Sequence, residues 1–154
     1  MKNEGVSQYE LLVSYLKILL VKAVRLKSQQ NPALAKAFEE DTEPFILQKL
    51  KDHIEEHFRS KHAPNEYADL LNISPKALGK LTKSHFNKTL TFLIADRIII
   101  EAKRELYLTS KPIKEIAFAL GFGDEYYFSR FFKNNADVSP HGYRESVGFG
   151  KAEG

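Results

Sequence analysis

The stretch from Ile116 to Lys133, IAFALGFGDEYYFSRFFK, decides how this chain folds. Apolar residues follow helical spacing as far as Leu120, and Gly121 then interrupts the pattern. A second helical pattern follows Asp124, whose carboxylate can cap a helix. A short helix, a tight turn and another short helix form a helix-turn-helix, in which the first helix supports the second. We therefore predict a helix-turn-helix unit at residues 112 to about 135.

A second copy of this pattern lies upstream. An offset of 49 positions aligns Ala68, Leu71 and Ile73 with Ala117, Leu120 and Phe122. After one inserted residue, an offset of 50 aligns Leu78, Lys80, Leu81 and Lys83 with Phe128, Arg130, Phe131 and Lys133. The repeat predicts a first helix-turn-helix at about residues 64–86, in which Ser74 caps the second helix and Pro75 occupies its first position.

The rest of the chain is also expected to be helical, because it shows no sustained two-residue alternation and no Asn-Gly or Asp-Gly hairpin turn. A long linker helix at about residues 91–108 joins the two units. We take the acidic, proline-ended stretch Glu39–Pro44 as a linker between an N-terminal helical segment, residues 1–40, and a larger domain, residues 44–147. The predicted fold is all-α, with two helix-turn-helix subdomains and an N-terminal helical appendage.

The net charge of the chain is small, but its positive charge is concentrated in one segment. The net charge of the 154 residues is only +3, but the segment Ser74–Lys88 carries four lysines and no acid. A basic stripe of this kind attracts a phosphate backbone, because binding there releases counterions. The chain has no cysteine, which excludes disulfides, thiolate metal ligands and cysteine nucleophiles. No apolar run approaches the ~20 residues of a membrane span, so we expect no membrane association and a cytoplasmic protein.

A family resemblance adds to this reading. The stretch Ile116–Lys133, followed by Ser139-Pro140-x-x-Tyr143-Arg144, resembles the second-unit signature of the AraC/XylS transcription regulators. Upstream, Ile73-Ser74-Pro75-x-x-Leu78-x-x-Leu81-x-Lys83 and Arg97, Glu101, Ala102 and Leu106 resemble the first unit and linker helix of that family. The resemblance covers Phe45 to Arg144. It implies sequence-specific binding to double-stranded DNA, with the two reading helices in successive major grooves. The family's sensing domain is absent, so we expect a truncated protein or one that lacks its sensor.

The resemblance also assigns roles to residues. The positions that correspond to base-reading residues are Lys76, Gly79, Lys80, Tyr126 and Arg130. Those expected at DNA phosphates are Ser74, Lys83, Glu125, Ser129 and Lys133. Arg130 is the strongest base-reading candidate, since a guanidinium fork fits guanine O6 and N7, although contact with phosphate alone stays an alternative. The aromatic residues Tyr127, Phe128, Phe131 and Phe132 are expected in the core, whereas Tyr126 is expected outside it.

Two residues depart from the family pattern. Gly79 offers no side chain where a polar reader is common, and glycine inside a helix costs ~1 kcal/mol relative to alanine. Asp137 stands where glycine is common after the second reading helix, but aspartate tolerates the left-handed conformation better than most residues.

One motif points to different chemistry. The segment His53-Ile54-Glu55-Glu56-His57 fits H-x-x-E-H, the inverted zinc-protease signature, and histidines four residues apart share a helical face. A protease also needs a third ligand and a substrate cleft, and two helix-turn-helix units leave no room for them. We therefore expect no enzyme, no metal site and no cofactor.

The remaining expectations concern protein partners. Tyr9, Leu12, Leu16, Leu19, Ala23 and Leu26 recur at alternating steps of three and four, as in a seam between two helices. The Tyr9–Leu26 helix also resembles a helix with which many family members dimerise, so a homodimer is expected. The alternative covers are the DNA-binding domain of the same chain and the missing sensing domain. The alternative to a reader of DNA is a protein-interaction module that contacts RNA polymerase or a partner regulator.

Overall fold

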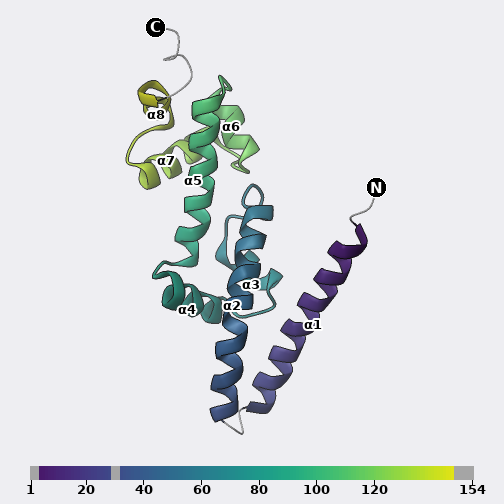
Figure 1. Cartoon of the computed structure of the whole chain (residues 1–154). Helices are drawn as coiled ribbons and strands as arrows, with labels where there is room; N and C mark the ends of the chain where they lie inside the picture. The colour runs from purple at the N-terminus through teal and green to yellow at the C-terminus, as the bar shows by residue number, and fades with distance from the viewer. Residues whose placement is uncertain (1–3, 29–31, 148–154) are drawn as a thin grey trace. The chain divides into compact units, whose positions relative to one another are not determined.

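The computed structural model describes the backbone of residues 4–28 and 32–147, and the side chains of residues 10–23, 26 and 42–147. Every regular element in this part of the chain is a helix, so the all-α prediction is confirmed. The helices are α1 (Glu4–Ser28), α2 (Pro32–His57), α3 (Pro64–Leu70), α4 (Pro75–Phe86), α5 (Leu90–Leu108), α6 (Ile113–Ala119), α7 (Glu125–Ala136) and α8 (Pro140–Val147) (Figure 1). The chain divides into two compact units, Met1–Leu50 and Lys51–Gly154.

Helix α2 runs through the segment that the sequence analysis took as a linker. Glu39–Pro44 lies inside Pro32–His57, so the prediction of a non-helical linker is wrong. Pro44 lacks an N–H and costs a helix interior ~3 kcal/mol. Glutamate, however, is a good helix former, and Ile46, Leu47 and Leu50 are all buried in the turns that follow. Burial of a leucine or isoleucine side chain contributes ~1.5–3 kcal/mol, so these side chains offset the cost of the proline.

Helices α3 and α4 form the first helix-turn-helix, in the range where the sequence places it. Asn72 takes φ 53° in the turn, a left-handed conformation that asparagine tolerates well. The Ser74 hydroxyl then accepts a hydrogen bond from the Ala77 N–H at 3.1 Å and caps α4 as expected. Ala68 of α3 and Leu78 of α4 are fully buried. One face of α4 is thus fixed in the core, which leaves the opposite face for a partner.

Helix α5 is shared by both subdomains. It starts after Thr89, whose hydroxyl accepts a hydrogen bond from the Phe92 N–H at 3.1 Å. Helices α3 and α4 pack on α5, and so do α6, α7 and α8. Its buried side chains are Leu90, Ile94, Ala95, Ile98, Ile99, Glu101, Ala102 and Leu106. They are distributed along the whole helix, so α5 supplies core to both helix-turn-helix units.

Helices α6 and α7 form the second helix-turn-helix. Asp124 caps α7, because its carboxylate accepts a hydrogen bond from the Tyr127 N–H at 2.9 Å. The internal repeat extends beyond α7. Helices α4 and α7 both end in a left-handed residue, Asn87 at φ 52° and Asp137 at φ 60°, and a hydroxyl residue then caps the next helix. The aspartate therefore does adopt the conformation for which glycine is common.

We expect Gly121→Ala to destabilise the fold. Gly121 has φ +84°, and a Cβ there would lie 2.1 Å from the carbonyl oxygen of Arg59. The left-handed conformation alone costs an L-residue ~1–2 kcal/mol, and the clash with backbone adds to this. Gly79→Ala is the matched control. A Cβ at Gly79 meets nothing within 4 Å, so the free energy of unfolding should rise by ~0.5–1 kcal/mol. Urea unfolding of both variants tests the pair, and equal stabilities would contradict the packing described.

Candidate nucleic-acid interface

The outward face of α4 is basic. Lys76, Lys80 and Lys83 are exposed, and Leu78, Leu81 and Thr82 are buried on the other side of the helix. Gly79 lies between the two faces and is half-buried. Ser74 is exposed at the start of α4, where its hydroxyl caps the helix. Each sequence-predicted residue of the first unit thus lies on or beside one exposed surface.

The outward face of α7 combines aromatic and basic groups. Tyr126 is 80% exposed, and Arg130 and Lys133 are also exposed, while Phe128 and Phe132 are fully buried. Glu125 and Ser129 are half-buried. A carboxylate repels phosphate, so only the backbone N–H of Glu125, in the first turn of α7, suits the expected phosphate contact.

One aromatic prediction is wrong. Tyr127 was expected in the core, but it is 56% exposed. Its ring lies 5.8 Å from that of Phe122, measured between centroids, so one edge packs and the other faces solvent. Phe131, also expected in the core, is half-buried. Helical spacing did not separate these residues from Phe128 and Phe132, because four aromatics in six positions cover more than one helix face.

The cations of these two faces are free to meet anions. Within the described residues, no carboxylate pairs with Lys76, Lys80 or Lys83 of α4, or with Arg130 or Lys133 of α7. Elsewhere in the same unit, arginines are paired. Arg59, Arg97 and Arg104 all meet the buried carboxylate of Glu101, with N···O distances of 2.7, 3.5 and 2.9 Å. The unit therefore has two kinds of cation: arginines paired with a buried carboxylate, and cations of α4 and α7 that are left for a ligand.

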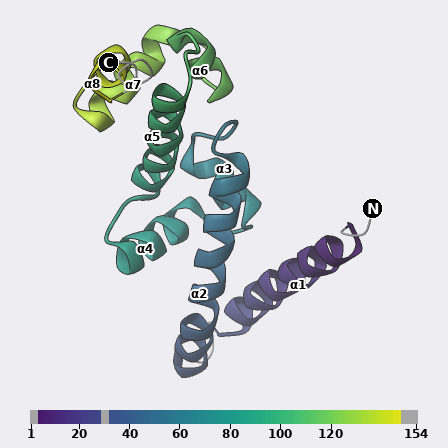
Figure 2. The same ribbon diagram turned by 45° about the horizontal axis from the view of Figure 1, so that its top comes forward.

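The two faces lie near opposite ends of α5. Figures 1 and 2 show α4 at the lower end of α5 and α7 to the left of its upper end, with α3 and α6 to the right of α5. The 19 residues of α5 span ~28 Å at 1.5 Å per residue. Successive major grooves on one side of DNA lie ~34 Å apart. The separation of the two basic faces thus agrees in scale with one turn of duplex DNA.

Comparison with known proteins identifies the family. A family model described as a helix-turn-helix domain matches residues 67–146. Regulatory protein SoxS of Salmonella typhimurium is 31% identical over 102 residues, which are 66% of this chain and 95% of SoxS. The chain belongs to the AraC-type helix-turn-helix family. It carries the DNA-binding domain of a transcription regulator.

Further relatives agree with this membership of the AraC family. The raffinose operon transcriptional regulatory protein RafR of Pediococcus pentosaceus is 29% identical over 107 residues, or 70% of this chain. This chain spans only 38% of the length of RafR. The C-terminal domain of AraT, a response regulator from Geobacillus stearothermophilus, has a TM-score of 0.66 and 28% identity. That likeness covers 71% of this chain and 91% of the AraT domain.

The structure adds residues that the sequence reading did not assign. Glu101 is only 4% exposed, and its arginine partners join α5 to the end of α2. Arg97 also donates to Glu55 at 2.6 Å. This hydrogen bond to Glu55 raises the pKa of Arg97. Burial lowers the pKa, but the negative charges of Glu55 and Glu101 raise it further, so the net shift is upward. Glu101 stands at an apolar position of the helical pattern, and this could have predicted a buried ion-pair network from the sequence. Nothing in the sequence indicated a role for His62, which lies in the loop after α2.

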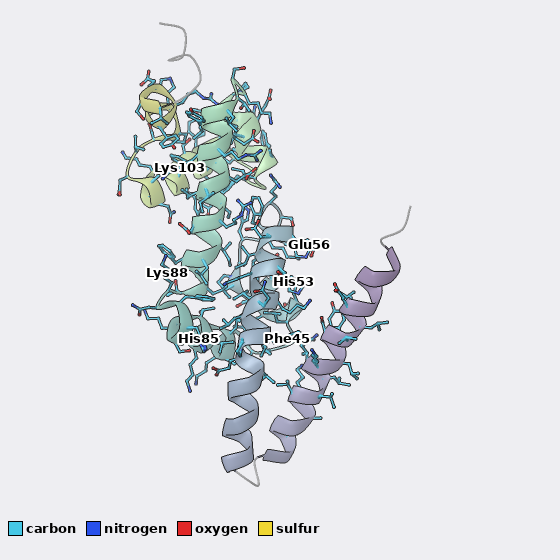
Figure 3. The ribbon with its side chains drawn as sticks, viewed as in Figure 1. Phe45, His53, Glu56, His85, Lys88 and Lys103 are labelled. Atoms are coloured by element: carbon cyan, nitrogen blue, oxygen red, sulfur yellow. The ribbon has the colours of Figure 1, made fainter. Side chains whose placement is uncertain are left out.

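The H-x-x-E-H motif forms a compact group of side chains. Donor atoms of His53, Glu56 and His57 lie within 4.8 Å of one another, and Figure 3 shows His53 and Glu56 on the same side of α2. The His53 and His57 rings are stacked, with centroids 5.9 Å apart. All three groups come from adjacent turns of one helix, and Glu56 is mostly exposed. The set thus offers three ligands where a structural zinc site takes four.

We expect zinc to be neither required for folding nor retained stoichiometrically. Three donors from a single helix leave coordination positions to water, which holds a metal more weakly than a closed four-ligand site. Metal analysis after washing with a chelator, beside thermal unfolding with and without zinc, measures both points. The His53→Ala variant is the control. Stoichiometric zinc that survives washing and disappears in this variant would contradict the prediction.

No helix in the described part of the chain is both long enough and apolar enough to span a bilayer.

Proposed function

We propose that this AraC-type domain binds duplex DNA with α4 and α7 in successive major grooves on one side of the helix. The observation that carries the proposal is the two basic faces near the ends of α5, whose cations have no carboxylate partner among the described residues. Both helices have a fixed inner face and an exposed outer face, as a helix that enters a groove requires. The free lysines supply attraction to phosphate, which is independent of sequence.

Base recognition rests on the exposed groups of both helices. We assign base contacts to Lys76, Gly79, Lys80, Tyr126 and Arg130, and phosphate contacts to Ser74, Lys83, Glu125, Ser129 and Lys133. Arg130 has no carboxylate partner among the described residues, so its guanidinium is free for a bidentate contact with guanine. We further propose that the chain acts in the cytoplasm, bound to the nucleoid, and that it activates transcription through RNA polymerase.

Arg130→Ala and Lys83→Ala should weaken DNA binding in different ways. Loss of a bidentate contact to guanine costs ~1–3 kcal/mol and relaxes preference at one base pair, whereas loss of a phosphate contact weakens all sequences about equally. Lys83→Ala should also lower the slope of log K against log salt by about one unit. Selection of duplexes from a random pool, followed by affinity measurements at two salt concentrations, gives both quantities.

Lys114→Ala is the matched control, because Lys114 is an exposed lysine on α6, the supporting helix. Its affinity should equal that of the original chain. If Arg130→Ala weakens every duplex to the same extent, Arg130 contacts only phosphate. If no duplex is enriched, or the affinity does not depend on salt, the proposal of duplex binding is wrong.

We propose further that α1 joins two copies of the chain. Ser14 and Ile18 are buried, and the Lys17 ammonium lies 5.2 Å from the centre of the Phe45 ring. Most of the apolar side chains of α1 that the structure describes are nevertheless exposed. The large exposed side chains are Leu11, Leu12, Tyr15, Leu16, Leu19, Leu20 and Leu26. Leu12, Leu16, Leu19 and Leu26 belong to the heptad-like series noted in the sequence, so a second copy of the same helix is the cover that this spacing favours.

Leu16→Glu combined with Leu19→Glu should convert a dimer into a monomer. Two carboxylates in an apolar seam lose the burial of both leucines and place like charges across the interface. Sedimentation at tens of micromolar protein measures the change. The control is Leu108→Glu, an exposed leucine of the C-terminal unit, which should sediment like the original chain. A monomeric original chain would show that α1 does not join two copies.

A further inference from the structure

The loop between α2 and α3, residues 58–63, is held from two directions. The Arg59 guanidinium donates to the Glu101 carboxylate of α5 at 2.7 Å. The carbonyl of Lys61 accepts a hydrogen bond of 2.8 Å from the hydroxyl of Tyr67, a fully buried residue of α3. Burial, with a smaller effect of the Glu66 charge, raises the pKa of Tyr67 to about 12, so this hydroxyl stays a donor at neutral pH. The loop is thus fixed to the first helix-turn-helix and to α5.

The same loop reaches the turn of the second helix-turn-helix. His62 Nε2 lies 2.9 Å from the carbonyl oxygen of Leu120. A carbonyl oxygen only accepts, so Nε2 carries the hydrogen and donates. The turn approaches the loop so closely that a Cβ at Gly121 would lie 2.1 Å from the Arg59 carbonyl. Residues far apart in the sequence therefore form a direct bridge between the two subdomains.

The bridge continues to the second reading helix through Phe122. The His62 and Phe122 rings have centroids 4.8 Å apart. Phe122 is buried and contacts the rings of Phe128 and Phe131 of α7, at 5.2 and 5.1 Å between centroids. A shift of the turn at Leu120–Phe122 must therefore shift α7 as well, because close-packed side chains transmit displacement.

We propose that His62 is a positioning residue, whose hydrogen bond to Leu120 fixes the separation of the two reading helices and so selects the spacing of the two half-sites in DNA. This inference rests on the proposed binding of α4 and α7 in successive grooves. The other connections between the two helix-turn-helix units are the packing of both on α5 and the close approach of Gly121 to the Arg59 carbonyl. Long helices bend, and a bond that bypasses α5 restrains that bending.

The separation of α4 and α7 can be measured without DNA. The chain contains no cysteine, so Ser84→Cys in α4 and Asn134→Cys in α7, both at exposed positions, allow specific attachment of two spin labels. Double electron–electron resonance then gives the distribution of distances between α4 and α7. We expect a single narrow distribution in the original chain, a broader one after His62→Ala, and an intermediate width after His62→Gln, whose amide can still donate to Leu120. His57→Ala is the control, since the His57 side chain contacts His53 and Glu56 of its own helix.

Selection of duplexes from a random pool tests the consequence for DNA. With the original chain we expect two half-motifs at one separation, ~10 base pairs from centre to centre. With His62→Ala the selected duplexes should include separations one base pair shorter and longer, and affinity for the original spacing should fall about three- to tenfold, the usual effect of one hydrogen bond.

The outcomes separate the two proposals. If the original chain selects no pair of half-motifs, the two-groove binding is wrong, and the spin-label distances still test the role of His62. If His62→Ala keeps the narrow distribution of the original chain, or if His62→Gln is as broad as His62→Ala, the hydrogen bond does not position the helices and the inference is overturned.

Discussion

The apolar surface of α5 must serve two subdomains at once. A helix-turn-helix of two short helices cannot bury both of its inner faces alone. The pairs α3–α4 and α6–α7 therefore each pack on α5, which covers those faces. Leu90 and Ile94 near one end of α5 and Ala102 and Leu106 near the other are buried for this reason. Because both units pack on the same helix, the orientation of one depends on that of the other. The outward faces of α4 and α7 follow from this single packing requirement.

Electrostatics divides the cations of the domain into two groups. Burial of a carboxylate is unfavourable unless the carboxylate is paired. Glu101 is paired with three arginines, one from the loop after α2 and two from α5 itself. The pairing removes these arginines from the set that can attract DNA. The lysines of α4 are left without such partners among the described residues. A modest net charge of +3 thus coexists with a strongly basic reading surface.

Local signals made most of the fold predictable. Ser74 and Asp124 were expected at helix starts, and each accepts the capping hydrogen bond that its side chain suits. The basic residues of α4 and α7 were predictable for the same reason, since the buried positions of an amphipathic helix define its exposed ones. Pro44 misled because helix breaking by proline is an average tendency, and the buried residues that follow it overcame it here. The prediction for Tyr127 was wrong because Tyr127 lies between two aromatic residues, Tyr126 and Phe128, in a run whose aromatics cover more than one helix face.

The bridge through His62 was not predictable from the sequence. Its histidine and its acceptor are separated by 58 positions, and the acceptor is a backbone carbonyl that has no residue-specific signature. Only the folded chain brings the loop after α2 beside the turn at Leu120. The same holds for Gly121, which the sequence marks as a turn residue but not as the point of closest approach between two subdomains.

The open space around Gly79 has a consequence for how this regulator can change its target over evolutionary time. Most positions on a reading helix are constrained, because a new side chain must fit beside older ones. Position 79 lies on the border of the reading face, and a Cβ there touches nothing within 4 Å. A single nucleotide change can thus add a functional group at the edge of the exposed face of α4 without disturbing the core. Under the proposed binding, a duplicated gene can acquire new target sites through a substitution at position 79 of α4, while α7 keeps its own contacts with DNA.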